Sequence, residues 1–142
     1  MNYSRRDLSL LLPALVAVGL DAKEAVLPSK VYSFDALPVK TSPRNHSESR
    51  QVFTGTTHTG CPIDLHITTL PPGQMPHPAH HHVHEEMFLI KEGTLEATIS
   101  GHSTTAGPGS IIYIASNDEH GVKNVGDAPA QYFVLAMGNA DA

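Results

Sequence analysis

An all-β fold is predicted by three features of this 142-residue chain. Short runs of alternating apolar and polar residues recur between about residues 50 and 138, and such alternation is typical of strands that bury one face. Gly, Pro, Asn and Asp separate these runs. No amphipathic helix pattern of useful length follows the first 25 residues. Together these features predict a closed or double-sheet β-barrel.

The first 25 residues have the pattern of an export leader. Arg5 and Arg6 precede an apolar stretch, about Leu8–Leu20, that is too short to span a bilayer as a mature helix but suits a signal peptide. The arrangement resembles a twin-arginine signal, which implies a periplasmic or secreted protein with no stable membrane span in its mature form. The cleavage site is poorly defined, at Ala22 or Ala25, so an N-terminal extension of a cytoplasmic protein is the alternative.

Residues 26–49 are predicted to form an N-terminal arm. Pro28, Pro38 and Pro43 interrupt short apolar pieces, and residues 41–49 are strongly polar. This composition suits a loop that wraps around a domain. The β-barrel domain is therefore predicted over residues 50–138.

Within that domain the strands and turns follow one another in order. Alternating apolar positions predict strands at 63–67, 87–90, 95–99, 112–114 and 132–137. Turn residues lie in the breaks, at 71–73, 93, 107–109, 117–118 and 126–127. The chain has 40% hydrophobic and 16% charged residues and no repeat or long linker. A single core is therefore predicted.

The overall charge excludes one class of partner. The formal net charge is -5 and no basic cluster follows the N-terminus, whereas an electrostatic grip on nucleic acid needs a basic stripe. The single Cys61 cannot form an internal disulfide. We interpret it as a small residue of a strand or turn, with a reactive thiol as the less favoured alternative.

His80, His82 and Glu86 have the spacing of a metal site on a β-scaffold. Alternate residues of a strand point to the same face, so His80 and His82 share a face, and Glu86 has the same parity on the next extended segment. Neutral imidazole nitrogens and carboxylate oxygens bind Fe, Mn, Ni, Cu and Zn. The spacing therefore predicts a site for one of these divalent ions. A solvated histidine loop that binds metal adventitiously is the alternative.

The same segment resembles the first motif of the cupin superfamily, G-x5-H-x-H-x3,4-E-x6-G. His80, His82, Glu86 and Gly93 fall on this pattern. Six residues, instead of five, separate Gly73 from His80, which indicates one extra residue in the entry loop.

The second cupin motif, G-x5-P-x-G-x2-H-x3-N, is matched by Gly109, His120 and Asn124. Ala115 replaces the motif's proline and Asn117 its glycine. Asn tolerates the left-handed backbone conformation better than most residues, so Asn117 can still make the turn.

The resemblance covers about residues 50–137 and implies a double-stranded β-helix, a jelly-roll-like barrel. It implies one divalent transition metal per chain, bound by four ligands: His80, His82, Glu86 and His120. It also implies a homodimer in which exposed apolar strand faces pair.

Other residues near the motifs have less defined roles. His77, His81 and His84 are interpreted as exposed imidazoles at the barrel mouth, and four other histidines as surface or strand residues: His46, His58, His66 and His102. Candidate acid–base groups, with solvated loop charges as the favoured alternative, are His84, Glu85, Asp118 and Glu119. Candidates for an apolar lining, with plain core as the alternative, are Phe88 and Ile90 together with some of Ile112, Ile114, Phe133 and Leu135.

Three function classes fit these observations. The favoured one is a metalloenzyme acting on a small oxygenated substrate, and the resemblance implies dioxygenases as well as isomerases, decarboxylases and lyases. The second is a non-catalytic barrel that binds a small molecule or sugar through the same metal. The third is a metal-handling protein whose His-rich mouth is the functional part.

Overall fold

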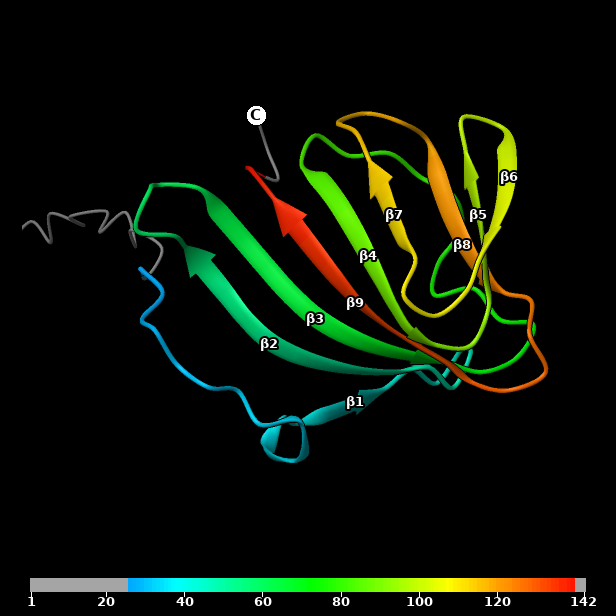
Figure 1. Cartoon of the computed structure of the whole chain (residues 1–142), viewed down its shortest axis with the longest axis horizontal. Helices are drawn as coiled ribbons and strands as arrows, with labels where there is room; N and C mark the ends of the chain where they lie inside the picture. The colour runs from blue at the N-terminus through cyan, green and yellow to red at the C-terminus, as the bar shows by residue number, and fades with distance from the viewer. Residues whose placement is uncertain (1–25, 140–142) are drawn as a thin grey trace, which may run out of the picture.

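The computed structural model describes residues 26–139 and has an all-β architecture (Figure 1). In this part of the chain a short 3-10 helix, η1 (Phe34–Ala36), precedes the strands. The strands, in chain order, are β1 (Val39–Thr41), β2 (Glu48–Thr56), β3 (Pro62–Leu70), β4 (Glu85–Glu92), β5 (Leu95–Ile99), β6 (His102–Ala106), β7 (Ile111–Ile114), β8 (His120–Asn124) and β9 (Ala130–Met137). The predicted all-β fold is confirmed.

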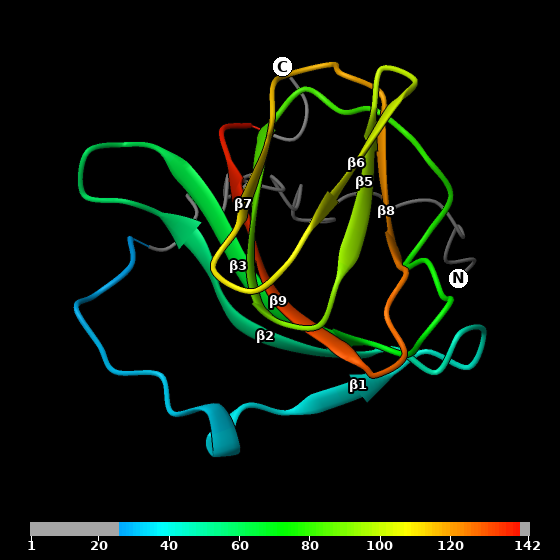
Figure 2. The same cartoon turned by 45° about the vertical axis from the view of Figure 1, so that its right-hand side comes forward.

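Two antiparallel sheets face one another and form the barrel (Figure 2). The larger sheet has the strand order β1-β2-β3-β9-β4-β7, and the smaller has the order β6-β5-β8. Strand β9, the last in the chain, lies in the middle of the larger sheet between β3 and β4. The two facing sheets agree with the double-sheet barrel that the sequence pattern predicts and with the double-stranded β-helix that the cupin resemblance implies.

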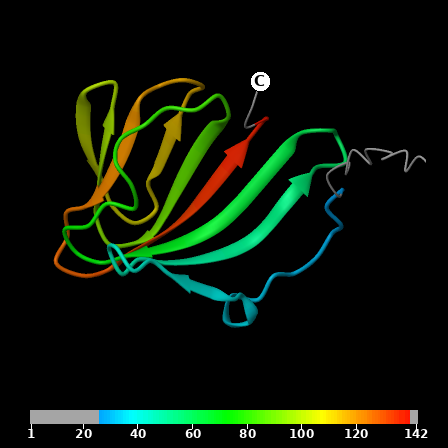
Figure 3. The same cartoon turned by 180° about the vertical axis from the view of Figure 1, so that it is seen from behind.

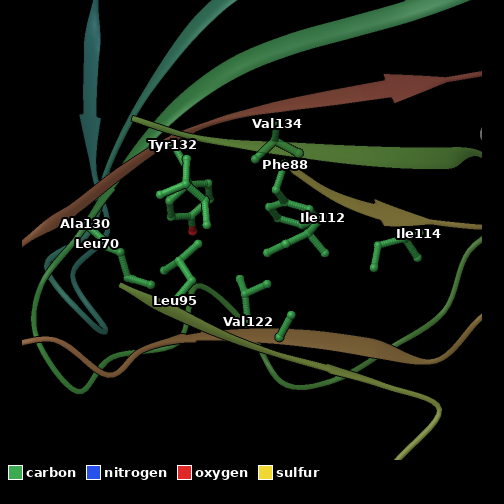
Figure 4. Packing of buried hydrophobic residues seen from close by; sticks show 11 residues of the cluster. Leu70, Phe88, Leu95, Ile112, Ile114, Val122, Ala130, Tyr132 and Val134 are labelled. Atoms are coloured by element: carbon green, nitrogen blue, oxygen red, sulfur yellow. The ribbon is translucent and has the colours of Figure 1, made fainter. Parts of the chain in front are cut away.

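The hydrophobic core fills the space between the two sheets (Figure 4). Phe88 lies opposite Val134 on one side and Ile112 on the other, so these three side chains point to the same face. Leu70 and Leu95 are fully buried. The cluster consists of Leu70, Phe88, Ile90, Leu95, Ala97, Ile112, Ile114, Val122, Ala130, Tyr132 and Val134.

Of the residues that the sequence offers for the lining beside Phe88 and Ile90, Ile112 and Ile114 face the barrel interior, and those of β9 do not. Phe133 lies opposite Leu89, which points away from the barrel interior, and Leu135 lies opposite Met87. Tyr132 and Val134 are the buried members of β9. Both faces of this strand are apolar, so its alternation could not identify the inner face.

The predicted arm contributes a strand and packs on the outer face of the larger sheet. Strand β1 pairs with β2, which begins two residues before the predicted start of the barrel domain. The guanidinium of Arg50 lies 4.5 Å from the ring centre of Phe34, and the rings of Tyr32 and Phe53 are 5.6 Å apart. Figure 3 shows the arm running along the β2 edge of the sheet.

The leader predicted over residues 1–25 lies outside the described residues. Within residues 26–139 no helix is long and apolar enough to cross a membrane.

Gly93 allows the sharp connection between β4 and β5. Its φ of +82° is a left-handed conformation that favours glycine, and a Cβ at this position would lie 2.5 Å from the Cα of Ala130. A backbone atom at that distance cannot move without displacing β9. Gly60, in the turn between β2 and β3, has a similar φ of +88° but open space around it.

We expect Gly93→Ala to lower the free energy of unfolding by about 3 kcal/mol, because backbone strain and steric overlap act together. Gly60→Ala is the matched control and should cost only about 1 kcal/mol, since it introduces the backbone strain alone. Urea denaturation followed by circular dichroism measures both. Equal losses in the two variants would show that the close approach to Ala130 is unimportant.

Candidate metal centre

A short antiparallel bridge joins two of the predicted ligands. The backbone N–H of His80 donates to the carbonyl of His120 at 3.0 Å, and the N–H of His120 donates to the carbonyl of His80 at 2.8 Å. Residues opposed in this way point to the same face, and the two imidazole centres are 4.7 Å apart. The bridge therefore brings a histidine of the β3–β4 loop beside the first residue of β8.

The N-terminal arm holds the loop that leads into this bridge. The side-chain amide of buried Asn45 donates to the carbonyl of Met75 at 2.6 Å and to that of Pro76 at 3.3 Å. Arg44 also donates to the carbonyl of Pro76, at 2.8 Å. The position of His80 thus depends on residues more than thirty positions earlier in the chain.

The turn before β8 fixes the second histidine of the first motif. Asn117 has the left-handed conformation that the sequence predicts, with φ of 64°. Its backbone N–H donates to the carbonyl of His82 at 2.8 Å. The motif turn therefore also anchors the ligand loop.

The structure brings the four predicted ligands together. Oε2 of Glu86 lies 3.3 Å from Nε2 of His120 and 3.5 Å from Nε2 of His82. Ligand atoms of His80, His82 and His120 all lie within 4.8 Å of one another. Glu86 is on β4 and His120 on β8, so the two sheets contribute to one cluster.

Hydrogen bonds orient two of these imidazoles. Nδ1 of His82 lies 2.7 Å from the carbonyl of His84, and Nδ1 of His120 lies 2.9 Å from the carbonyl of Asp118. A carbonyl only accepts hydrogen bonds, so each Nδ1 carries the proton. In the neutral ring, Nε2 then presents a lone pair to the cluster.

The inward-facing nitrogen atoms fit a metal ion. Nε2 of His82, Nε2 of His120 and Nδ1 of His80 are buried and have no hydrogen-bond partner among the described residues. A buried polar atom without a partner costs about 1–3 kcal/mol, so three of them in one place need an explanation. A divalent ion bound by three imidazoles and Glu86 would satisfy all three.

The surroundings of His80 and His84 favour the neutral form of these two imidazoles. Burial lowers the pKa of His80, and repulsion from His77, His120 and His82 lowers it further. Burial and the neighbouring His82 likewise lower the pKa of His84. The neutral ring is the form that binds metal.

His84, a candidate acid–base group from the sequence, lies beside the cluster. Its ring stacks on that of His82, with centres 3.6 Å apart and planes at 6°, and its Nε2 lies 3.9 Å from Oε1 of Glu86. His82, His84 and Glu86 form a second group of donors able to hold a metal. His77 and His81 are exposed, as the sequence interpretation placed them.

The other candidate acid–base groups place no side chain among the four predicted ligands. Glu85 has the opposite parity to Glu86 and so points to the outer face of the sheet. There its side chain forms a hydrogen bond with the exposed Tyr113, which raises the pKa of the Tyr113 hydroxyl. Asp118 acts on the cluster through its carbonyl, and Glu119 is exposed.

A cavity of about 370 Å³ adjoins the cluster at Glu86 and His84. Asp64 and His66, which the sequence analysis did not place at the site, line its other side. The signal that could have identified them is their spacing, because Asp64 and His66 stand two apart on one strand and so share a face.

Comparisons with known proteins agree with this architecture. The family model described as "Cupin domain" matches residues 66–136, half of the chain. A comparison with curated protein sequences found no match.

Several solved structures have the same fold at low sequence identity. KdgF from Halomonas sp. has a TM-score of 0.67 and 13% identity, covering 78% of this chain and 95% of that chain. The polyketide cyclase RemF from Streptomyces resistomycificus has a TM-score of 0.64 and 16% identity, with coverages of 80% and 81%. A sugar phosphate isomerase of the cupin superfamily from Silicibacter pomeroyi has a TM-score of 0.63 and 16% identity, with coverages of 78% and 76%.

We expect the protein to retain one equivalent of a divalent transition metal after dialysis, and His120→Ala to lose it, because a buried ligand is removed. His102→Ala removes an exposed histidine from β6 and should retain the metal. Elemental mass spectrometry of the purified proteins measures the content. Equal metal in the His120→Ala variant and the wild type would contradict the four-ligand site.

Proposed function

The chain belongs to the cupin family, and on this premise we propose that it is a metal-dependent enzyme acting on a small oxygenated molecule. A dioxygenase-like oxidation is the favoured reaction. The observation that carries the proposal is the convergence, beside a cavity and around the Glu86 carboxylate, of three buried imidazole nitrogens that make no hydrogen bond among the described residues. A purely structural histidine cluster would satisfy these nitrogens by hydrogen bonds within the protein.

The ligands of the metal in this proposal are His80, His82, Glu86 and His120. An Fe, Mn, Ni or Cu ion would supply redox and Lewis-acid chemistry there, and zinc would supply Lewis-acid chemistry alone.

The chain's own groups prepare the site in two ways. The carbonyls of His84 and Asp118 hold two of the imidazoles in one orientation, so two of the four ligands are oriented before a metal binds. Phe88 and Ile114, both buried, exclude water on the inner side of Glu86 and strengthen the electrostatic interactions around it.

A non-oxidative reaction is the second candidate. The isomerase and the cyclase among the structural neighbours indicate that barrels of this kind support such chemistry, and the same four ligands could polarise a substrate oxygen. A non-catalytic barrel that binds a small molecule or sugar is the alternative outside enzymes. Ligand-dependent thermal stabilisation without any product would favour it.

We expect Glu86→Gln to keep the fold and to lower turnover at least about a hundredfold, because the carboxylate is a ligand at the centre of the site. Oxygen uptake and product mass spectra, recorded for the metal-loaded protein with a panel of enols and hydroxylated acids, measure the loss. Glu119→Gln is the matched control, since it changes an exposed carboxylate one residue before His120. Undiminished turnover in Glu86→Gln would contradict the assignment.

We propose that the protein is exported through its twin-arginine-like leader. Arg5 and Arg6 with the following apolar stretch support this proposal. The mature chain should appear in the periplasmic or extracellular fraction with a mass shortened by roughly 22–25 residues. An uncleaved chain confined to the cytoplasm would exclude export.

We also propose a homodimer formed through the outer face of β4 and β7. Leu89 and Ile111 lie opposite one another there, with 37% and 61% of their surfaces exposed, beside Tyr113. Contiguous exposed apolar side chains of this size are typical of interfaces.

We expect light scattering to give twice the chain mass for the wild type and the monomer mass for Ile111→Glu. Val31→Glu, at an exposed position on the arm, should remain dimeric; a monomeric wild type would exclude the dimer.

A further inference from the structure

One row of residues crosses the inner face of the larger sheet beside the metal centre. Strand register places Thr54 opposite Asp64, Asp64 opposite Ala136, and Ala136 opposite Glu86. Opposed residues on antiparallel strands point to the same face. Two carboxylates therefore face the barrel interior on either side of an alanine.

The small side chain of Ala136 leaves room between these carboxylates. The cavity of about 370 Å³ is lined by Asp64 and His66 on one side, by Glu86 and His84 on the other, and by Ala136 between them. Adjacent strands are about 4.8 Å apart, so the Cα atoms of Asp64 and Glu86 are separated by roughly 10 Å. The space suits a small molecule, since ligand pockets start at about 300 Å³.

Three side chains fix the Asp64 carboxylate. The amide of Gln51 donates to Oδ2 at 2.7 Å, and the hydroxyl of Thr54 donates to the same oxygen. Nδ1 of His66 lies 3.4 Å from Oδ1. The register of β2 shifts between Gln51 and Phe53, which marks a bulge that can direct a side chain toward a site. Such an arrangement holds a charged group that the β-barrel core does not need.

The contact with Asp64 decides which atom of His66 is free to bind a ligand. A carboxylate only accepts hydrogen bonds, so Nδ1 carries the proton and Nε2 of the neutral ring is an acceptor. Among residues 26–139 no Lys or Arg pairs with Asp64. This wall therefore offers hydrogen-bond acceptors, Nε2 of His66 among them, and no Lys or Arg, which suits a hydroxyl group and disfavours a second carboxylate.

We propose that the cavity over Ala136 binds a short hydroxylated carboxylic acid, with its hydroxyl donating to Nε2 of His66 and its carboxylate at the metal centre beside Glu86. The inference rests on the proposed function, because without a metal Glu86 repels the carboxylate. In this arrangement His66 determines specificity, Asp64 positions His66, and Ala136 leaves the space between the two ends of the ligand.

The test uses cobalt(II)-loaded protein, whose visible spectrum reports a carboxylate arriving at the metal. The probes are the ω-hydroxy acids of three, four and five carbons, each compared with the unsubstituted acid of the same length. At one or more lengths the hydroxy acid should bind about tenfold more tightly, the effect of one hydrogen bond to a polarised group. His66→Leu should remove this preference without changing the affinity for the unsubstituted acid.

Two further variants separate recognition from structure. His66→Gln, whose amide oxygen can accept a hydrogen bond, should retain part of the preference. Ala136→Leu should lower the affinity for both acids at least tenfold, because the larger side chain fills the cavity. The cobalt content should stay at the wild-type value, because no metal ligand is changed. Unchanged binding in Ala136→Leu would place the acids elsewhere and overturn the inference.

The outcomes also distinguish this inference from the proposed function. The inference would be overturned if cobalt-loaded protein bound the two acids with equal affinity at every length, or bound neither. Either result would leave the proposed metal centre unaffected. A preference that survives in His66→Leu would overturn the role of His66. Failure of the wild type to bind cobalt would overturn both proposals.

Discussion

The register of β4 between β9 and β7 is the constraint on which both the core and the site depend. It places Phe88 opposite Val134 and Ile112, and Glu86 opposite Ala136 and Ile114. A shift by one residue would turn Glu86 outward and bring Met87 into the barrel. The same hydrogen bonds that bury the apolar side chains therefore aim a carboxylate at the histidines.

The site needs a second, non-local constraint, because three of its four predicted ligands come from outside β4. The reciprocal bonds between His80 and His120 connect the β3–β4 loop to the opposite sheet, and Asn45 of the arm holds the start of that loop. Carbonyl acceptors then orient the rings of His82 and His120. The backbone of His80 and the rings of His82 and His120 are held by these hydrogen bonds, so the buried nitrogen of each ring stays available for a metal.

Charge is distributed unevenly across the barrel interior. Apolar residues from both sheets fill one end, and the other end carries Glu86, Asp64 and several imidazoles. Two carboxylates facing a shared cavity repel one another and favour the entry of a cation. The proposed metal would neutralise the negative charge on the Glu86 side, while hydrogen bonds from Gln51 and Thr54 stabilise the carboxylate of Asp64 on the other side.

The sequence alone determined the fold class, because alternation and turn residues are local properties that survive in any barrel of this kind. It also indicated His80, His82 and Glu86 by their spacing, and His120 by its motif. The sequence could not predict strand β6, which is mostly exposed and lacks apolar alternation. It also could not identify the inner face of β9, because both faces of that strand are apolar. Only the tertiary structure placed Asp64 and His66 beside the cluster, because their proximity to Glu86 depends on strand pairing across β3, β9 and β4.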